Sequence, residues 1–172
     1  AVLDTGINPH PDLVYPQNRI VGFFDAIHGR VGTYDDSSHG TNVAGIVAGN
    51  GYLSSRNYVG IAPKCHLVGV KVLNHHGEGY VNHFMKGIEW ILENRERYGI
   101  RIANISVASV RDQLYGEQSE FVKRVDEMWD VGIIVVASAG NLGPGKQTIG
   151  APGNSRKIIT VGSSDEEFRF AG

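Results

Sequence analysis

Short apolar runs alternate along the chain with longer segments in which apolar residues recur at helical spacing. Short runs rich in β-branched side chains are typical of parallel strands that are buried on both faces. The pattern therefore predicts an α/β fold with a mostly parallel sheet and helices on both of its faces. The predicted strands span residues 1–3, 20–23, 67–72, 102–107, 133–137 and 158–161.

Three segments carry the spacing of helices that pack one apolar face on a sheet. In the longest of them the apolar stripe contains Phe84, Ile88 and Ile91, and Gly99 follows where a carboxy-terminal cap belongs. Clusters of glycine and proline fall between the predicted elements, and no repeat or linker divides the chain, so we expect one domain. The predicted helices span residues 41–48, 81–98 and 119–131.

Composition narrows the classes of partner. Of the 172 residues, 41% are hydrophobic and 20% charged, and the net charge is -2, which is the profile of a globular domain. A nearly neutral chain has no broad attraction to nucleic acid or to an anionic membrane, and no apolar run is long enough for a membrane helix. We therefore expect neither partner. Cys65 is the sole cysteine, so no internal disulfide can form.

Asp4 follows the first predicted strand and precedes Thr5 and Gly6. Open α/β sheets keep their functional side chains at the carboxyl ends of parallel strands, and this position suits such a carboxylate. An aspartate before glycine at a strand end is also ordinary turn chemistry. Asp4 by itself does not separate these two interpretations.

His39 stands between a polar loop and the predicted helix 41–48, followed by small residues that permit close packing. An imidazole in the first turn of a helix is rigidly held, as a general base must be, and Asp4 is the carboxylate that we expect to orient it. An isolated histidine at a helix start is more often a surface residue. The presence of Asp4 favours the base.

Asn141 follows a strongly apolar predicted strand and the small residues Ala139 and Gly140. A side-chain amide at the carboxyl end of a strand can donate an N–H to an oxyanion. The alternative is a turn, which Gly-Asn pairs favour. The oxyanion interpretation depends on Asp4 and His39 being functional as well.

Taken together, these segments resemble the subtilase family of serine peptidases. Residues 3–7 with 10–13 resemble its aspartate segment, 39–45 its histidine segment and 137–141 its oxyanion segment. The resemblance implies a three-layer subtilisin-like fold, truncated at both ends, with residues 1–172 as a partial peptidase domain. Further motifs extend it over nearly the whole chain, at residues 60–63, 70–73, 87–90, 104–106, 151–154 and 161–162.

The resemblance also implies a serine endopeptidase that acts on a peptide or protein substrate. Asp4 would hold the tautomer of the imidazole, His39 would take and return the proton, and Asn141 would stabilise the tetrahedral oxyanion. A peptide would bind by adding a strand between two segments. These segments contain Gly77 and Gly79 on one side and Ser106, Val107 and Ala108 on the other.

Two positions depart from the family pattern. Asn42 stands where the family most often has a second histidine, behind the base rather than among the reacting groups. Ala108 stands where glycine is usual beside the first specificity pocket. Its methyl group would narrow the pocket and shift preference toward smaller side chains.

The nucleophile that the family requires has no counterpart here. The family places its serine in a Gly-Thr-Ser segment at the start of a helix, and no such segment follows Asn141. Ser155, Ser163 and Ser164 remain, and none stands between small residues. Because the chain also starts inside a predicted strand, we expect a fragment that is inactive and prone to aggregate by itself.

Two other function classes fit part of the pattern. Asp4-Thr5-Gly6 is also the signature tripeptide of aspartic peptidases, but these need a second such motif or a homodimer and are largely antiparallel β. A catalytically inactive peptide-binding protein of the same fold would explain the missing serine. Retention of both Asp4 and His39 argues for the enzyme.

The sequence also bears on metal binding and location. Asp12 matches an acidic position that helps to hold a structural calcium in many subtilases, but residues 50–58 do not plainly supply further oxygen ligands, so we predict no metal site. His75 and His76 lack a nearby third ligand for zinc. The loop residues 8–11 resemble bacterial subtilases that often lack a secretion signal, which favours the cytoplasm and leaves secretion open. The sequence does not indicate an oligomeric state.

Overall fold

The computed structural model of the protein describes residues 1–108 and 119–164. The chain divides into two compact units, Ala1–Ala103 and Asn104–Gly172. Both units combine helices with parallel strands. The chain therefore has the α/β fold that its hydrophobic pattern predicts. Within the part of the chain that the structure describes, no helix combines the length and the apolar character needed to span a bilayer.

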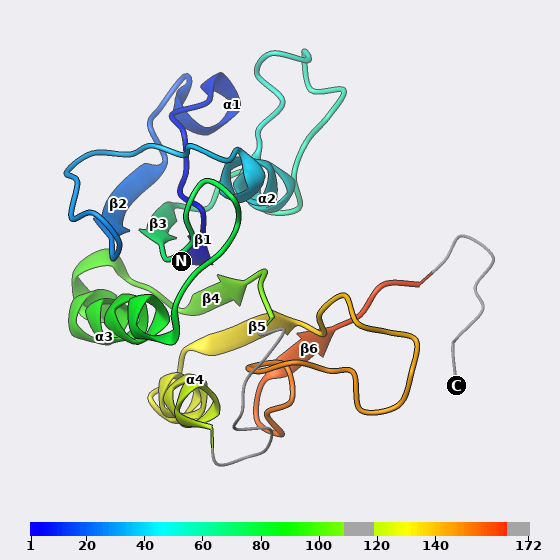
Figure 1. The fold of residues 1–172 in the computed structure, drawn as a ribbon. Coiled ribbons are helices and arrows are strands. Elements are labelled where there is room, and N and C mark those ends of the chain that lie inside the picture. Colours follow the sequence, from blue (N-terminus) through cyan, green and yellow to red (C-terminus); the bar gives the residue numbers. More distant parts are fainter. Residues whose placement is uncertain (109–118, 165–172) are drawn as a thin grey trace. The chain divides into compact units, whose positions relative to one another are not determined.

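Three strands form the sheet of the first unit, in the order β2, β3, β1 (Figure 1). They are β1 (Val2–Asp4), β2 (Ile20–Asp25) and β3 (Leu67–Lys71). β3 pairs in parallel with both neighbours, and its last residue, Lys71, stands opposite Asp4 and Asp25. The carboxyl ends of these strands therefore meet at one edge. A fourth strand, β4 (Ile102–Ile105), begins at the end of this unit.

Helices cover both faces of this sheet, α2 (His39–Ala48) on one and α3 (Val81–Tyr98) on the other. Val2 packs in a buried cluster with Ala44 and Ala48 of α2. The next residue, Leu3, points to the opposite face, because side chains alternate along a strand, and lies near Gly87 of α3. The prediction of helices on both faces is confirmed here.

A short helix that the periodicity did not predict, α1 (Pro11–Val14), follows β1 and packs beside α2. His10 caps it, because its ring nitrogen Nδ1 accepts from the Asp12 N–H at 3.2 Å. Leu13 is its buried residue and joins the α2 cluster. One helical turn is too short to show a periodic apolar stripe, so its sequence gives only a capping signal.

The second unit contains α4 (Glu120–Asp130), β5 (Ile134–Ser138) and β6 (Ile159–Val161). β5 and β6 are parallel, and α4 packs on β5. Val135 and Ala137 are buried, whereas the alternate residues are not: Ile134 is 44% exposed and Val161 is 53% exposed. The prediction that every strand is buried on both faces is therefore wrong for β5 and β6, and also for Val21 of β2 (39% exposed) and Ile102 of β4 (54% exposed).

Most predicted boundaries agree with the structure to within two residues. The predicted helix 81–98 has the observed bounds, while the predicted helix 41–48 begins earlier, at His39. The strand predicted over residues 102–107 ends at Ile105, so Ser106 and Val107 lie beyond the strand.

Candidate active site

The structure brings Asp4 and His39 into contact. Asp4 is the last residue of β1 and its side chain is fully buried, whereas His39 is the first residue of α2 and its side chain is 51% exposed. Nδ1 of the imidazole lies 2.7 Å from Oδ1 of the carboxylate. This contact engages one ring nitrogen, which leaves Nε2 as the nitrogen that can exchange a proton with a bound molecule.

A second donor reaches the same carboxylate oxygen. The main-chain N–H of Thr5 donates to Asp4 Oδ1 over 2.7 Å. The other oxygen, Oδ2, is buried and has no hydrogen-bond partner among the described residues. Buried acceptors normally find a donor, so this oxygen has unused capacity at the base of the site.

Two glycines allow the segments around this pair to approach each other. A Cβ atom added to Gly40 would lie 2.2 Å from the main-chain oxygen of Gly6 and 3.0 Å from Asp4 Cβ. At Gly6, φ is +125° and an added Cβ would lie 2.1 Å from the main-chain oxygen of Tyr34. A side chain at position 40 would therefore push the first turn of α2 away from the end of β1, and one at position 6 would push away the loop at Tyr34.

The N–H groups in the first turn of α2 are satisfied by side chains from outside the helix. Ser38, at the amino-terminal cap position, has a φ of +76° and makes no capping hydrogen bond with its own side chain. Instead the Gly40 N–H donates to Thr5 Oγ1 at 2.9 Å, and the Thr41 N–H donates to Asp35 Oδ2 at 2.9 Å. These bonds fasten the residues that flank His39 to the end of β1.

Lys71 places a buried positive charge beside this assembly. Its side chain is fully buried, and Nζ donates to the main-chain oxygens of Thr5 (2.6 Å) and Leu73 (2.8 Å) and to Asp36 Oδ1 (2.6 Å). Burial would raise the pKa of Asp36, but the hydrogen bond and the charge of Lys71 outweigh it and lower this pKa below its usual value. The sequence analysis missed Lys71, although a lysine in an otherwise apolar strand was a visible signal.

An open cleft of about 920 Å³ lies beside α2 in the same unit. Asn42 and Ile46 line it from the helix, and Tyr58 and Ile61 line it from the loop that follows. Ile61 is 90% exposed and Tyr58 is 82% exposed, so the cleft presents an apolar surface to solvent. Asn42, which departs from the family pattern, is therefore an exposed residue on the side of the helix that lines this cleft.

The two glycines predicted to bind substrate lie in and after a tight turn of the first unit. Gly77 has a φ of +77°, and its N–H donates to the main-chain oxygen of Asn74 at 3.0 Å. Asn74 Oδ1 closes the turn further by accepting from the Glu78 N–H. At Gly79, an added Cβ would lie 2.5 Å from the main-chain oxygen of Val72, so this segment packs directly on the chain after β3.

The predicted oxyanion residue and the other predicted substrate residues belong to the second unit. Asn141 is exposed and follows Gly140, which has a φ of +93°. A Cβ atom added to Gly140 would lie 3.0 Å from Cβ of Ala108, so the methyl group of Ala108 is close to the residue that precedes Asn141. Ser106 Oγ accepts from Nδ2 of Asn104 at 2.7 Å, and Val107 follows in the chain.

Among the described residues, no imidazole or amine contacts Ser155, Ser163 or Ser164. Ser155 is buried, and its hydroxyl donates to Asp126 Oδ1 at 2.5 Å while accepting from the Lys157 N–H. This arrangement links α4 to the segment before β6. Ser163 and Ser164 are exposed and follow β6. Asp126 can orient the Ser155 hydroxyl, but no imidazole or amine is in place to accept its proton.

The surroundings of Asp12 do not suit the calcium ion that its position in the family implies. Its Oδ1 accepts from the Leu53 N–H at 2.9 Å, and its main-chain oxygen accepts from the Asn50 N–H and from the Arg19 guanidinium. Protein donors, one of them positively charged, thus occupy these oxygens, whereas calcium needs six to eight free oxygen ligands. The described residues contain no cluster of three or more acidic, histidine or cysteine side chains that could hold a metal.

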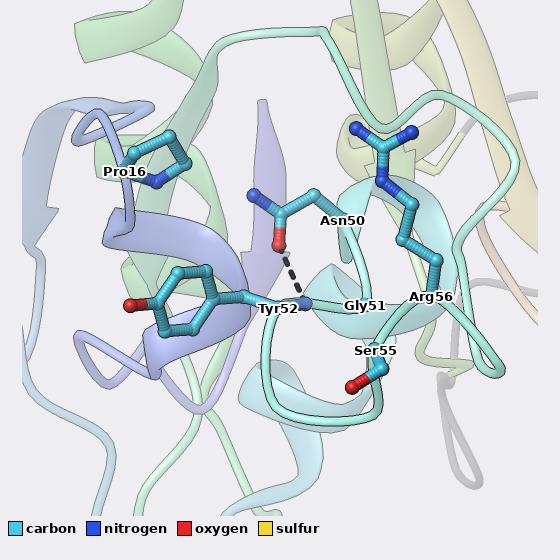
Figure 2. Close-up of a pocket in the computed structure, with 6 residues that line it drawn as sticks. All are labelled: Pro16, Asn50, Gly51, Tyr52, Ser55 and Arg56. Atoms are coloured by element: carbon cyan, nitrogen blue, oxygen red, sulfur yellow. Dashed lines mark hydrogen bonds between the residues drawn. The ribbon is translucent and has the colours of Figure 1, made fainter.

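The Asn50 side chain holds the adjoining loop, and Figure 2 shows its hydrogen bond to Tyr52. Asn50 Oδ1 accepts from the Tyr52 N–H at 3.0 Å, and Nδ2 of the same side chain donates to the main-chain oxygen of Tyr15. A small cavity of about 380 Å³ opens here, with Arg56 on its wall and no carboxylate. Its lining is therefore also unsuited to a cation.

Comparison with known proteins gives consistent matches. The model of the subtilase family matches residues 1–169. The serine protease AprX of Bacillus subtilis (strain 168) is 44% identical over 170 residues, which cover 96% of this chain and 38% of that protein. Subtilisin Savinase of Lederbergia lenta is 36% identical over 166 residues, which cover 96% of this chain and 55% of that protein.

A solved structure agrees with these matches. A cold-adapted subtilisin-like serine proteinase superposes with a TM-score of 0.78 at 25% identity, covering 95% of this chain and 54% of that one. The prediction of a subtilisin-like fold is thereby confirmed. The chain spans from about two fifths to just over half the length of the proteins that it matches.

Proposed function

The chain belongs to the subtilase family, and from this premise we propose that the complete protein hydrolyses peptide bonds with Asp4, His39 and Asn141 among its catalytic groups. The observation that carries the proposal is the 2.7 Å contact between His39 Nδ1 and Asp4 Oδ1. A buried carboxylate against a half-exposed imidazole is the arrangement that a serine peptidase needs for its base. The nucleophilic serine is assigned to a part of the protein beyond these 172 residues.

In this proposal Asp4 holds the proton on Nδ1 of His39, so that Nε2 is an acceptor. Nε2 takes the hydroxyl proton as the serine oxygen attacks the peptide carbonyl carbon, and the negative charge moves to the carbonyl oxygen. The side-chain N–H of Asn141 donates to that oxyanion. His39 then gives its proton to the leaving amine, and water hydrolyses the acyl-enzyme by the same steps.

We assign peptide binding to main-chain groups of Gly77, Gly79, Ser106, Val107 and Ala108, through added-strand hydrogen bonds. A natural substrate for this chain is a protein or an extended peptide. Residues 1–172 by themselves are proposed to be inactive, because removal of the nucleophile costs about a million-fold in rate in subtilisin itself.

A fluorophosphonate probe, which reacts with activated serines, tests the proposal in the complete protein. We expect labelling of the wild type, none above background with His39→Ala, and slower labelling with Asn141→Ala. The protein ending at Gly172 should stay unlabelled. Absence of labelling in the wild-type complete protein, with peptide still bound, would replace the enzyme by a peptide-binding protein of the same fold.

A further inference from the structure

We propose that Asp35 is a positioning residue that holds His39 against Asp4 by fixing Thr5 and the first turn of α2. The inference deepens the proposed function, because it assigns a residue to the same site. Asp35 is 8% exposed and lies in the loop before the helix. Among the hydrogen bonds of the described residues, none joins Asp35 to a ring nitrogen of His39, so Asp35 acts on the imidazole through Thr5 and through the main chain beside His39.

Asp35 connects three segments through five hydrogen bonds. Oδ1 accepts from Thr5 Oγ1 (2.8 Å) and from the N–H groups of Ser37 and Ser38 (both 3.0 Å). Oδ2 accepts from the Thr41 N–H (2.9 Å) and from Thr41 Oγ1 (2.6 Å). These donors come from the end of β1, from the loop and from α2. His39 stands between Ser38 and Gly40, inside the chain segment that these bonds hold.

An ionised carboxylate is needed because it accepts without donating. Each threonine hydroxyl has one proton, and both protons point to Asp35, so the hydroxyl oxygens are left as acceptors. Thr5 Oγ1 then accepts from the Gly40 N–H at 2.9 Å, and Thr41 Oγ1 accepts from the Asn8 N–H at 3.0 Å. An amide at position 35 would present its own N–H to one of these donors, and that hydrogen bond would be lost.

The carboxylate is suited to this role at neutral pH. Burial would raise the pKa of Asp35, but hydrogen bonds from Thr41, Ser37 and Thr5 outweigh it and lower the pKa below its ordinary value. The main chain reinforces the connection, because Gly6 forms an isolated bridge with Asp35, and the Asn8 amide bonds both main-chain groups of Asp35. Asp35 is therefore bonded to α2 directly at Thr41, and Thr5 links it to the Gly40 N–H, next to His39.

The test uses the complete protein and two readouts, the low-field proton resonance of His39 Nδ1 and the rates of peptide hydrolysis. Thr5→Val removes the hydroxyl, and Thr5→Ser keeps it. Asp35→Asn removes the charge, and Asp25→Asn is the matched control. Asp25 is a buried carboxylate with four donors, Tyr34 and the N–H groups of residues 27, 28 and 30.

We expect Thr5→Val and Asp35→Asn to lose the low-field proton or to speed its exchange at least about tenfold. Their kcat should fall about 10²-fold with little change in KM, as for a displaced catalytic group. Thr5→Ser and Asp25→Asn should keep the resonance and kcat near wild type, although Asp25→Asn loses stability. An unchanged resonance in folded Thr5→Val, or equal losses in Asp25→Asn and Asp35→Asn, overturns the proposal.

The readouts separate this inference from the proposed function. A wild-type protein without peptidase activity contradicts the proposed function, and the resonance still shows whether Asp35 and Thr5 hold His39 against Asp4. If Asp35→Asn does not fold, the Thr5→Val and Thr5→Ser pair decides. In that pair, equal resonances in the two variants overturn the role of the hydroxyl and with it the link to Asp35.

Discussion

The main-chain N–H of Thr5 donates to the same oxygen of Asp4 that contacts the His39 ring, so one carboxylate oxygen receives both groups. The Thr5 hydroxyl meanwhile accepts from the Gly40 N–H, next to His39 in the chain. Thr5 is therefore bonded to Asp4 through its main chain and to Gly40, the neighbour of His39, through its side chain.

Substitution of Asp4 by asparagine should abolish most of the activity of the complete protein. The asparagine amide can present an N–H to Nδ1 and so favour the wrong tautomer, for which we expect kcat to fall about 10⁴-fold. Hydrolysis of a peptide substrate at saturation measures this. Asp130→Asn removes an exposed carboxylate that pairs with Lys157 and should leave kcat unchanged. A mild loss in Asp4→Asn would show that Asp4 does not hold the tautomer of His39.

Two glycines of the same helix should respond oppositely to alanine. Gly40→Ala places a methyl group 2.2 Å from the Gly6 oxygen, and we expect a loss of about 3 kcal/mol in the free energy of unfolding. At Gly45 an added Cβ meets no atom within 4 Å, so Gly45→Ala should stabilise by about 0.5–1 kcal/mol through helix propensity. Urea unfolding of both variants measures the difference. Equal effects would contradict the close approach at Gly40.

Acid should destabilise the fold in part through Asp35 and Asp25, which are both buried. Burial opposes ionisation of Asp25, but hydrogen bonds from Tyr34 and nearby N–H groups outweigh it and lower its pKa, as at Asp35. Their stabilisation is therefore complete above the ordinary aspartate pKa of about 3.9 and is lost as pH falls through the lowered values.

The fall in the free energy of unfolding between pH 6 and pH 2.5 measures this contribution. It should be smaller in Asp35→Asn and in Asp25→Asn than in the wild type, by about 1.4 kcal/mol for each unit by which the pKa is lowered. Asp130→Asn, at an exposed ion pair, serves as the control and should follow the wild type. Identical pH dependence in all four proteins would contradict the lowered pKa values.

Chelation of divalent cations should leave the loop beside Asp12 intact. Asp12 is already bonded to Leu53 and Asn50, so amide exchange of Leu53 should be the same with and without EDTA. Asp12→Ala removes the acceptor of the Leu53 N–H and should speed this exchange at least about tenfold, with or without calcium. Faster exchange of the wild-type amide in EDTA would show that a cation holds the loop.

Peptide preference should depend on Ala108. Its methyl group lies close to Gly140, beside Asn141, and we expect it to favour small residues at the first specificity pocket. Ala108→Gly removes this methyl group and should widen the pocket. We expect kcat/KM for phenylalanine-type peptides to rise about tenfold relative to alanine-type peptides. Unchanged preference in Ala108→Gly would remove Ala108 from the pocket.

The periodic parts of the fold could be read from the sequence, and the polar network could not. The stripe of α3 gave its observed bounds, and the position of Asp4 at a strand end placed it correctly relative to His39. Asp35 stood in a run of polar residues that reads as an ordinary turn. Its contacts reach 30 residues back to Thr5, and no local pattern encodes a partner at that separation.

The contacts of Lys71 could not be predicted either, because its acceptors include the main-chain oxygen of Thr5, 66 residues away. Main-chain acceptors leave no mark in the sequence. The exposed residues Ile134 and Val161 were likewise unpredictable, because a β-branched residue reads as buried whether or not an element covers it.

The buried amine of Lys71 makes the third strand of the first unit part of the support for the site. Asp4 and His39 leave the ribosome well before residue 71, yet β1 pairs with β3, and the Lys71 amine bonds both Thr5 and Asp36 in the segments that carry them. A nascent chain that ends before β3 lacks both the neighbouring strand and the internal cation. Until residues 67–71 are present, the segments that carry Asp4 and His39 therefore lack a neighbouring strand and the amine that bonds Thr5 and Asp36.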